Sequence, residues 1–365
     1  MFDCRQTIAF ISIGALLFCL FNFLSNFCQY EKHTNIDSSF PIQFVSTQMG
    51  ACLESKPVIT WLFVWSVTVQ MLLLFDSVCS CQSVFQISLF SQDSLFHRLY
   101  HRLFDPLFFV KNYYMFLACL TIFLNTNIAG VAEFKSIGDS QSELTLHYIA
   151  AILVMASFWC IHLTISICVK DQYYRSWTCV YLVMFLLLLC LMLSYFVTDR
   201  GRVLNVSIMT EWVLLFIALI LQIYGELALK CQLLKCQLLH PEQCRVQQQT
   251  CTAIDFMDDS GHAQQPVQNK HQEDPNRSVN RSESAFLIWI LFWFLVQVLV
   301  TCFLTPPWFI KNPWFIKNSD LQTGPHYWCF VIFSNCAILL MCLGRSNNSF
   351  FLIFSSLVIL LIWGT

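Results

Sequence analysis

The sequence is poor in charged residues, in glycine and in proline. Only 12% of its 365 residues are charged, whereas soluble globular chains carry roughly a quarter. With 10 glycines and 10 prolines, it lacks the composition of collagen, of low-complexity fibres and of disordered proteins. Its 20 basic and 22 acidic residues give a formal net charge of -2, so no basic excess is present to hold nucleic acid. These absences exclude an ordinary soluble, fibrous or nucleic-acid-binding protein.

The sequence also lacks the short motifs that carry common enzyme chemistry. No P-loop, nucleophile elbow, His-Glu-x-x-His or glycine-rich phosphate fingerprint occurs. Among the 19 cysteines there is no Cys-x-x-Cys pair, so a zinc site or a thioredoxin-like site has no support. We therefore expect no cofactor and no metal site, and the sequence gives no direct indication of catalysis.

Hydrophobic residues are abundant instead, at 57%, and 35 of them are phenylalanine. A helix that spans a bilayer needs about 20 apolar residues. Nine stretches meet or nearly meet this length: Thr7–Leu24, Val58–Phe75, Asn112–Ala132, His147–Val169, Cys179–Val197, Val206–Leu229, Ala285–Leu304, Tyr327–Leu343 and Ser349–Trp363. The sequence thus predicts an all-α polytopic membrane protein, with a six-helix transmembrane bundle and about three further C-terminal hydrophobic helices.

The predicted spans divide the chain into three parts. Residues 1–229 hold six spans and form the membrane domain. Residues 230–284 form a cytosolic linker, and its second half has the polar composition of a disordered segment. Residues 285–365 form a hydrophobic extension with two or three spans, because its last two stretches are short enough to be re-entrant or interfacial helices. This extension is either an appendage that does not pack against the six-helix bundle or a part of that bundle.

The first apolar stretch, with Arg5 ahead of it, resembles a signal peptide. The run Ser25-Asn26-Phe27 that follows offers no pair of small residues for cleavage, so we expect a retained signal anchor. Lys and Arg are more frequent in the segments that would share a side with the N-terminus. The positive-inside rule therefore predicts a cytosolic N-terminus.

Ionisable residues inside a span are costly and are functional candidates by default. Glu211 lies inside the sixth span and His147 opens the fourth, both toward the luminal side, so the two are candidates for a pair. In the alternative interpretation, Glu211 reaches the interface beside Trp212 and His147 caps its helix. For His162 we favour a hydrogen bond to a neighbouring helix, for example to Asn125 or Asn127.

The cysteines at the membrane boundaries fall into two groups. Cys28 and Cys52 share the first luminal loop, where a disulfide bond is a candidate because that compartment is oxidising. Four further cysteines lie at cytosolic boundaries, where S-palmitoylation and a free thiol are equally good interpretations. These four are Cys79, Cys81, Cys231 and Cys236.

Several short segments occur in an order and spacing that resemble a known family. The first luminal loop carries Phe44–Gly50, which includes Val-Ser-Thr-Gln-Met-Gly. Leu144–His147 runs directly into the fourth span, Arg175–Trp177 precedes the fifth, Tyr195-Phe196 ends it, and Glu211-Trp212 lies in the sixth. On these segments, residues 1–230 resemble the six-pass FRAG/DRAM/SFK family, and the Val-Ser-Thr-x-Met-Gly spacing is most similar to its PGAP-type branch, which remodels the lipid of GPI anchors.

This resemblance implies an integral protein of the Golgi or endoplasmic reticulum that takes part in exchanging the fatty chains of GPI anchors, without necessarily being the acyltransferase. Its partners would be membrane lipids, GPI-anchored proteins or their remodelling enzymes. A luminal cluster of Ser46, Gly50, His147 and Glu211 would hold the lipid headgroup. The rival is a non-catalytic DRAM-like regulator of autophagy or of phosphoinositide signalling, in the lysosomal or plasma membrane. A channel or transporter is a third and weaker alternative, because only Glu211, His162, Asn125 and Asn127 could line a path.

Overall fold

The computed structural model describes residues 4–25, 42–55, 57–81, 106–134, 141–169, 171–198, 201–239, 284–297 and 324–346. All the secondary structure in these residues is helical. The labelled helices are α1 (Cys4–Leu24), α2 (Val45–Ser55), α3 (Pro57–Ser80), α6 (Pro106–Glu133), α7 (Gln141–Cys168), α8 (Gln172–Thr198), α9 (Gly201–Leu239) and α14 (Gly324–Ser346). A further apolar helix occupies Ser284–Gln297.

Six of these helices are long and apolar enough to cross a membrane. They are α1, α3, α6, α7, α8 and α9, which correspond to the first six predicted spans. The chain is therefore an all-α polytopic membrane protein, as its sequence predicts. Helix α9 ends at Leu239 rather than at Leu229, so the first part of the predicted 230–284 linker is helical. Residues 240–283 of that linker, and the ninth predicted stretch, lie outside the described residues.

Two helix starts follow directly from local chemistry. Helix α3 begins at Pro57, a residue that suits the first helical position because its missing N–H has no intrahelical partner there. Helix α8 is capped by Asp171, whose Oδ1 accepts a hydrogen bond from the backbone N–H of Tyr174 at 2.8 Å. The two signals fix where the second and fifth membrane helices begin.

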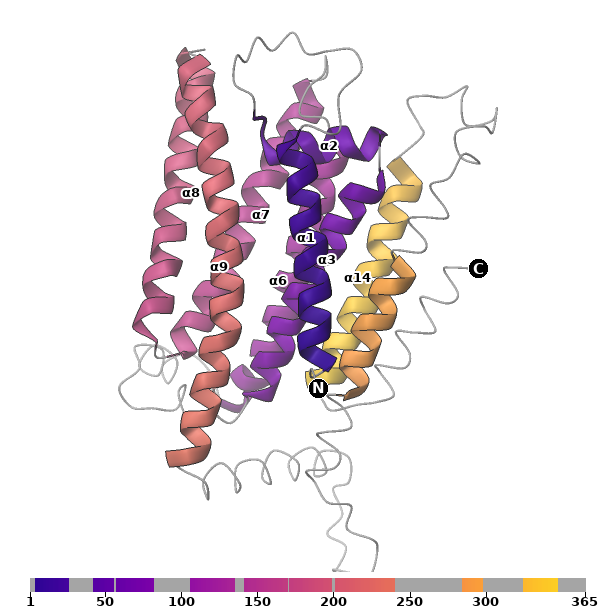
Figure 1. The fold of residues 1–365 in the computed structure, drawn as a ribbon, viewed down its shortest axis with the longest axis vertical. Coiled ribbons are helices and arrows are strands. Elements are labelled where there is room, and N and C mark those ends of the chain that lie inside the picture. Colours follow the sequence, from indigo (N-terminus) through magenta and orange to yellow (C-terminus); the bar gives the residue numbers. More distant parts are fainter. Residues whose placement is uncertain are drawn as a thin grey trace, which may run out of the picture.

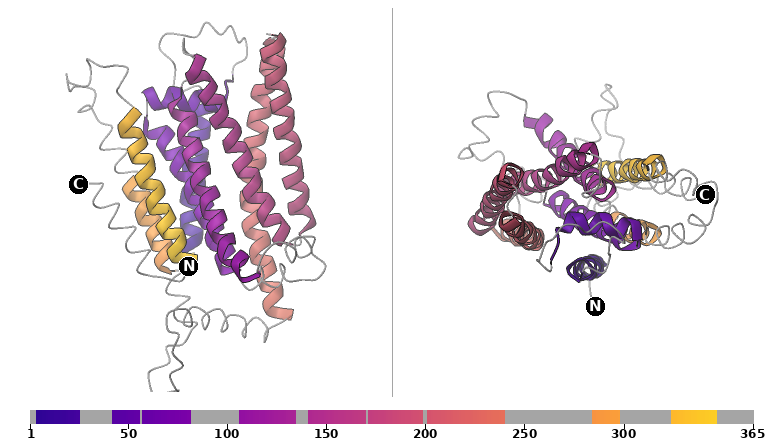
Figure 2. Two further views of the ribbon diagram at one scale, coloured as in Figure 1. Left: turned by 180° about the vertical axis from the view of Figure 1, so that it is seen from behind. Right: turned by 90° about the horizontal axis from the view of Figure 1, so that it is seen from above.

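Helix α3 lies at the centre of the bundle and most of its length is buried. Helix α1 packs against α3, α6 packs against α7 and against α14, and α8 packs against α9. Figures 1 and 2 show the long helices running side by side, with α8 and α9 at one edge and α14 with the Ser284–Gln297 helix at the opposite edge. The short helix α2 lies across the end of the bundle away from the N-terminus (Figure 1).

The C-terminal helices pack into the bundle. The Trp293 ring meets that of Trp65 of α3 edge-on, at 5.3 Å between centroids, and stacks on Trp289 at 5.9 Å. On α14, Asn335 accepts a hydrogen bond from Asn125 at 2.6 Å and donates one to Thr126 at 2.8 Å, both on α6. The described part of residues 285–365 therefore packs into the bundle and is not an appendage.

A buried ion cluster joins the first helix, the central helix and α14. Asp76, at the end of α3, is completely buried. Its Oδ2 lies 2.8 Å from Nη1 of Arg5, and its Oδ1 lies 2.5 Å from Nε of Arg345. Arg5 also donates to Ser77 Oγ, and Arg345 donates to Ser80 Oγ at 2.9 Å. Buried charges need such partners, since an unpaired one would lose its hydration without compensation.

Candidate functional site

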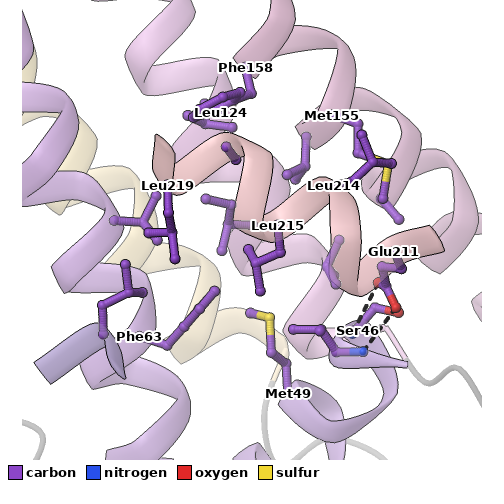
Figure 3. Close-up of a pocket in the computed structure, with 18 of the residues that line it drawn as sticks. Ser46, Met49, Phe63, Leu124, Met155, Phe158, Glu211, Leu214, Leu215 and Leu219 are labelled. Carbon is purple, nitrogen blue, oxygen red and sulfur yellow. Dashed lines mark hydrogen bonds between the residues drawn. The ribbon is translucent and has the colours of Figure 1, made fainter. Parts of the chain in front are cut away.

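A cavity of about 140 Å³ lies inside the bundle, and helices α1, α2, α3, α6, α7, α8 and α9 all contribute to its wall. Its lining is mostly aliphatic and aromatic: Leu16, Val45, Met49, Phe63, Val67, Met71, Leu124, Ile128, Val131, Ala151, Val154, Met155, Phe158, Leu214, Leu215, Ala218 and Leu219. The polar lining residues are Ser46, Gln70, Tyr181, Glu211 and Gln222. Figure 3 shows the aliphatic side chains converging on the space and Glu211 beside Ser46.

Glu211 closes one end of the cavity by capping a helix that is distant in the sequence. Its Oε2 accepts a hydrogen bond from the backbone N–H of Val45 at 2.9 Å, and its Oε1 accepts one from that of Ser46 at 3.4 Å (Figure 3). These are the first two residues of α2, whose N–H groups have no acceptor within their own helix. A carboxylate at a helix N-terminus is also favoured by the helix dipole. Glu211 is therefore the cap of α2.

Trp212 reinforces this contact. Its indole Nε1 donates a hydrogen bond to the backbone O of Gln43 at 3.0 Å, just ahead of α2. The pair Glu211-Trp212 of α9 therefore holds the segment from residue 43 to residue 46. Two of the segments on which the family resemblance rests, Phe44–Gly50 and Glu211-Trp212, are thus in direct contact.

Helix α2 is fixed at further points along its length. The backbone O of Met49 accepts a hydrogen bond from Thr60 Oγ1 of α3 at 2.8 Å, and the Met49 side chain lines the cavity. Cys52 is disulfide-bonded. Its predicted partner Cys28 lies outside the described residues, so that pairing stays a prediction. Helix α2 thus covers the end of the cavity, and hydrogen bonds to α3 and α9 hold it in place.

The other two members of the predicted luminal cluster lie elsewhere. Nδ1 of His147 is hydrogen-bonded to the backbone O of Phe134 at 2.9 Å, across the connection between α6 and α7. The proposed pair of His147 with Glu211 is not formed, because each side chain has its own backbone partners. Gly50 is buried within α2 and does not line the cavity. The structure therefore brings together Ser46 and Glu211, but not Gly50 and His147.

His162 has a hydrogen-bond partner on a neighbouring helix, although a different one from Asn125. Its Nδ1 lies 2.6 Å from the hydroxyl of Tyr174 on α8. The Tyr174 ring is accommodated by Gly225 of α9, where an added Cβ would lie 3.1 Å from the hydroxyl oxygen. Asn125 instead accepts from Thr68 at 2.8 Å and donates to α14. These hydrogen bonds tie neighbouring helices together.

Two glutamines line the cavity well away from Glu211. Gln222 Nε2 donates to the backbone O of Gln70 at 2.7 Å, and Gln70 Nε2 donates to Ser12 Oγ of α1. Gln222 follows Glu211 by three turns of α9, which is about 16 Å of helix rise. Both residues are amides inside apolar runs of the sequence, and because they carry no charge the sequence does not mark them as candidates.

The palmitoylation candidates differ in accessibility. Cys79 and Cys81 are buried, whereas Cys231 is exposed, and the side chain of Cys236 lies outside the described part. Of the three described thiols, that of Cys231 is the accessible one. Within the described residues, no group of three His, Cys, Asp or Glu side chains is arranged to hold a metal ion.

Comparison of the chain with protein-family models, with curated proteins and with solved structures finds no match. The family resemblance therefore stays an expectation from the sequence. What the site itself offers is an apolar chamber with one capped carboxylate at its end. The described lining residues include no histidine.

Proposed function

We propose that this chain is an integral protein of the Golgi or endoplasmic reticulum membrane that holds a fatty chain of a GPI anchor while the lipid of that anchor is remodelled. The observation that carries the proposal is the apolar cavity, which is closed at one end by α2 and Glu211. The resemblance of residues 1–230 to the PGAP-type branch supports the choice of lipid.

The size and chemistry of the cavity fit part of one hydrocarbon chain. An engineered apolar protein cavity of about 150 Å³ stays dry and binds benzene. At about 140 Å³, the present cavity has room for several methylene groups of a chain but not for a whole lipid. The headgroup would therefore stay outside, beyond the cover formed by α2. This arrangement suits a protein that positions a lipid for another enzyme.

The test is a rescue experiment in cells that lack the protein. We expect the fatty chains of their GPI-anchored proteins, measured by mass spectrometry, to differ from normal, and the wild-type chain to restore them. Ala218→Phe fills the cavity and should fail to restore them at normal protein level. Ile220→Phe adds the same ring on the exposed face of the same helix, and it should restore them.

Unchanged GPI lipids in cells without the protein would overturn the proposal. The DRAM-like alternative would then be examined by measuring autophagic flux and phosphatidylinositol 4-phosphate in the same cells. If Ala218→Phe restored the lipids as well as the wild type does, the cavity would not be needed for remodelling.

A further inference from the structure

The cavity has a floor at the end away from α2. Phe158 of α7 lines the cavity and is 8% exposed. Its ring packs at 5.3 Å between centroids against that of Tyr181 of α8, which also lines the cavity. Figure 3 shows Phe158 at the opposite end of the space from Glu211 and Ser46. Aromatic rings from two helices thus close the end of the cavity that lies deeper in the bundle.

The floor rests on a layer that is packed and hydrogen-bonded. His162 lies one turn further along α7, outside the cavity lining, and its ring centroid is 4.3 Å from that of Phe158. Nδ1 of His162 is hydrogen-bonded to the hydroxyl of Tyr174, and the Tyr174 ring lies against Gly225. Both of these side chains are completely buried. An occupant of the cavity therefore cannot move deeper without displacing a close-packed layer.

The wall of the cavity is about as deep as one leaflet of a membrane. On α9 the lining residues run from Glu211 to Gln222, an interval of about 16 Å of helix rise. The hydrocarbon core of a bilayer is about 30 Å thick, so each leaflet contributes about 15 Å. At the deep end, Gln222 Nε2 donates to the backbone O of Gln70 at 2.7 Å and so holds α9 to α3. The depth is therefore fixed by contacts between helices.

The cavity is narrow as well as deep. A compact apolar cavity of about 150 Å³ holds a benzene ring. In this chain a volume of about 140 Å³ is distributed over the depth of a leaflet, which leaves a tube too narrow for two chains side by side. The lining along this depth is apolar, with Leu214, Leu215 and Leu219 on the α9 side. The tube therefore suits one linear hydrocarbon chain that extends along α9.

The length of a chain decides how well it fits such a tube. A chain that moves from lipid into an apolar cavity gains little, since lipid tails are as apolar as leucine. A chain that ends above the floor leaves a void, and the lining loses its dispersion contacts there. A chain that is too long presses on the floor, and a close-packed wall resists overpacking. The best occupant is thus the chain whose end just reaches the floor.

We infer that the cavity selects its acyl chain by length: the preferred occupant is one linear chain whose terminal methyl group reaches Phe158, and Phe158 is the residue that sets this length. The inference rests on the proposed lipid-holding function and adds a preference among chains. The polar end of the lipid stays outside, beyond α2, and the methyl end lies at the floor. Chains that fall short of the floor or exceed it are held less well.

The test uses the purified full-length protein in phosphatidylcholine nanodiscs and a phosphatidylcholine probe with a diazirine at the methyl end of one chain. Crosslinks are mapped by mass spectrometry. Labelling is competed with lysophosphatidylcholines that share one headgroup and differ in chain length, compared at equal concentration in the disc. We expect competition to be greatest at one length and roughly tenfold weaker for chains that are a few methylene groups longer or shorter. The crosslinks should fall around Phe158 and Tyr181.

The variant Phe158→Ala removes the ring from the floor, so the greatest competition should move to longer chains. Phe116→Ala makes the same change on the exposed face of α6 and should leave the preferred length unchanged. A preferred length that stays the same in a folded Phe158→Ala protein overturns the role of Phe158.

Two results with the wild type separate this inference from the proposed function, whether or not the variant folds. Labelling of the cavity lining without a preferred length overturns the length inference alone and leaves a cavity that accepts any chain. Failure of the probe to label the lining overturns the lipid cavity itself, and with it both proposals.

Discussion

At the scale of single residues, the main finding is that a carboxylate in a membrane helix serves as the cap of another helix. Glu211 and Val45 are separated by 166 residues. The sequence indicates Glu211 as a functional candidate, but it suggests His147 as the partner instead of the start of α2. Its two carboxylate oxygens accept two backbone N–H groups. A glutamine has one oxygen for these two donors, so the substitution tests the cap.

We expect Glu211→Gln to destabilise the cover formed by α2 by about 1 to 3 kcal/mol, the cost of leaving a buried donor without its acceptor. Hydrogen–deuterium exchange at the amides of Val45 and Ser46 should be faster in the variant, because those N–H groups lose an acceptor. Exchange elsewhere in α3 should be unchanged. His147→Ala, which acts at Phe134, should add to this effect independently, and a coupling well above about 0.5 kcal/mol would contradict separate sites.

The ion cluster predicts that removing its carboxylate destabilises the protein more than removing one of its arginines. Asp76→Asn leaves the guanidinium groups of Arg5 and Arg345 buried without their shared anion, so we expect a loss of about 3 to 5 kcal/mol. Arg345→Met leaves Asp76 still paired with Arg5 and should cost less. Thermal unfolding of the purified proteins in one detergent compares the two variants. A larger loss for Arg345→Met would mean that packing of α14, rather than charge, dominates.

How well the sequence predicts the role of a residue depends on the kind of residue. Apolar runs predict helices well, because a bilayer imposes their length. The sequence does not indicate the role of Asp76, because the predicted second span ends at Phe75, one residue before it. A charged residue just outside a span is normally expected to face water. Gln70 and Gln222 were missed because amides carry no charge. Their roles depend on which helices become neighbours, and that information is tertiary.

At the scale of helices, the C-terminal elements complete the core. Trp293 packs against Trp65 of α3 and stacks on Trp289, and Asn335 accepts a hydrogen bond from Asn125 of α6. The sequence predicts both apolar stretches but not their partners, because tryptophan and asparagine occur in them without a periodic pattern that points to α3 or α6. Burial of the polar groups of α3 and α6 depends on these added helices.

We therefore expect a stop codon after Ser284 to destabilise the protein. The truncated chain would leave Trp65 and Asn125 facing lipid and would remove Arg345 from Asp76. Pulse-chase measurement should show faster degradation of the truncated chain than of the full-length protein. Coexpression of residues 285–365 as a separate chain should restore part of the lifetime. A truncated protein with normal lifetime would mean that the six-span unit is self-sufficient.

At the scale of the whole molecule, the ion cluster constrains topology. Arg5 and Arg345 contact the same carboxylate, so the start of α1 and the end of α14 lie on the same side of the membrane. A cytosolic N-terminus, as the distribution of Lys and Arg predicts, then puts Arg345 on the cytosolic side. This agrees with the positive-inside rule for both residues.

Glycosylation tests this topology. Asn276 and Asn280 belong to acceptor sequences in the predicted cytosolic linker, outside the described residues, and we expect them to stay unmodified. Asn205 lies in α9, near its predicted luminal end, and should be used poorly because it is close to the membrane. Treatment with an endoglycosidase followed by electrophoresis measures this. A glycan on Asn276 or Asn280 would reverse the orientation of the whole chain.

The shared carboxylate of Asp76 also has a consequence for the order of biosynthesis. Arg345 follows Asp76 by 269 residues, and ribosomes add roughly 5 to 20 residues per second. Arg345 thus emerges about 15 to 50 s after Asp76, whereas Arg5 has been available since the start of translation. Helices α1 and α3 can therefore associate first, and α14 docks onto an existing ion pair as a late step.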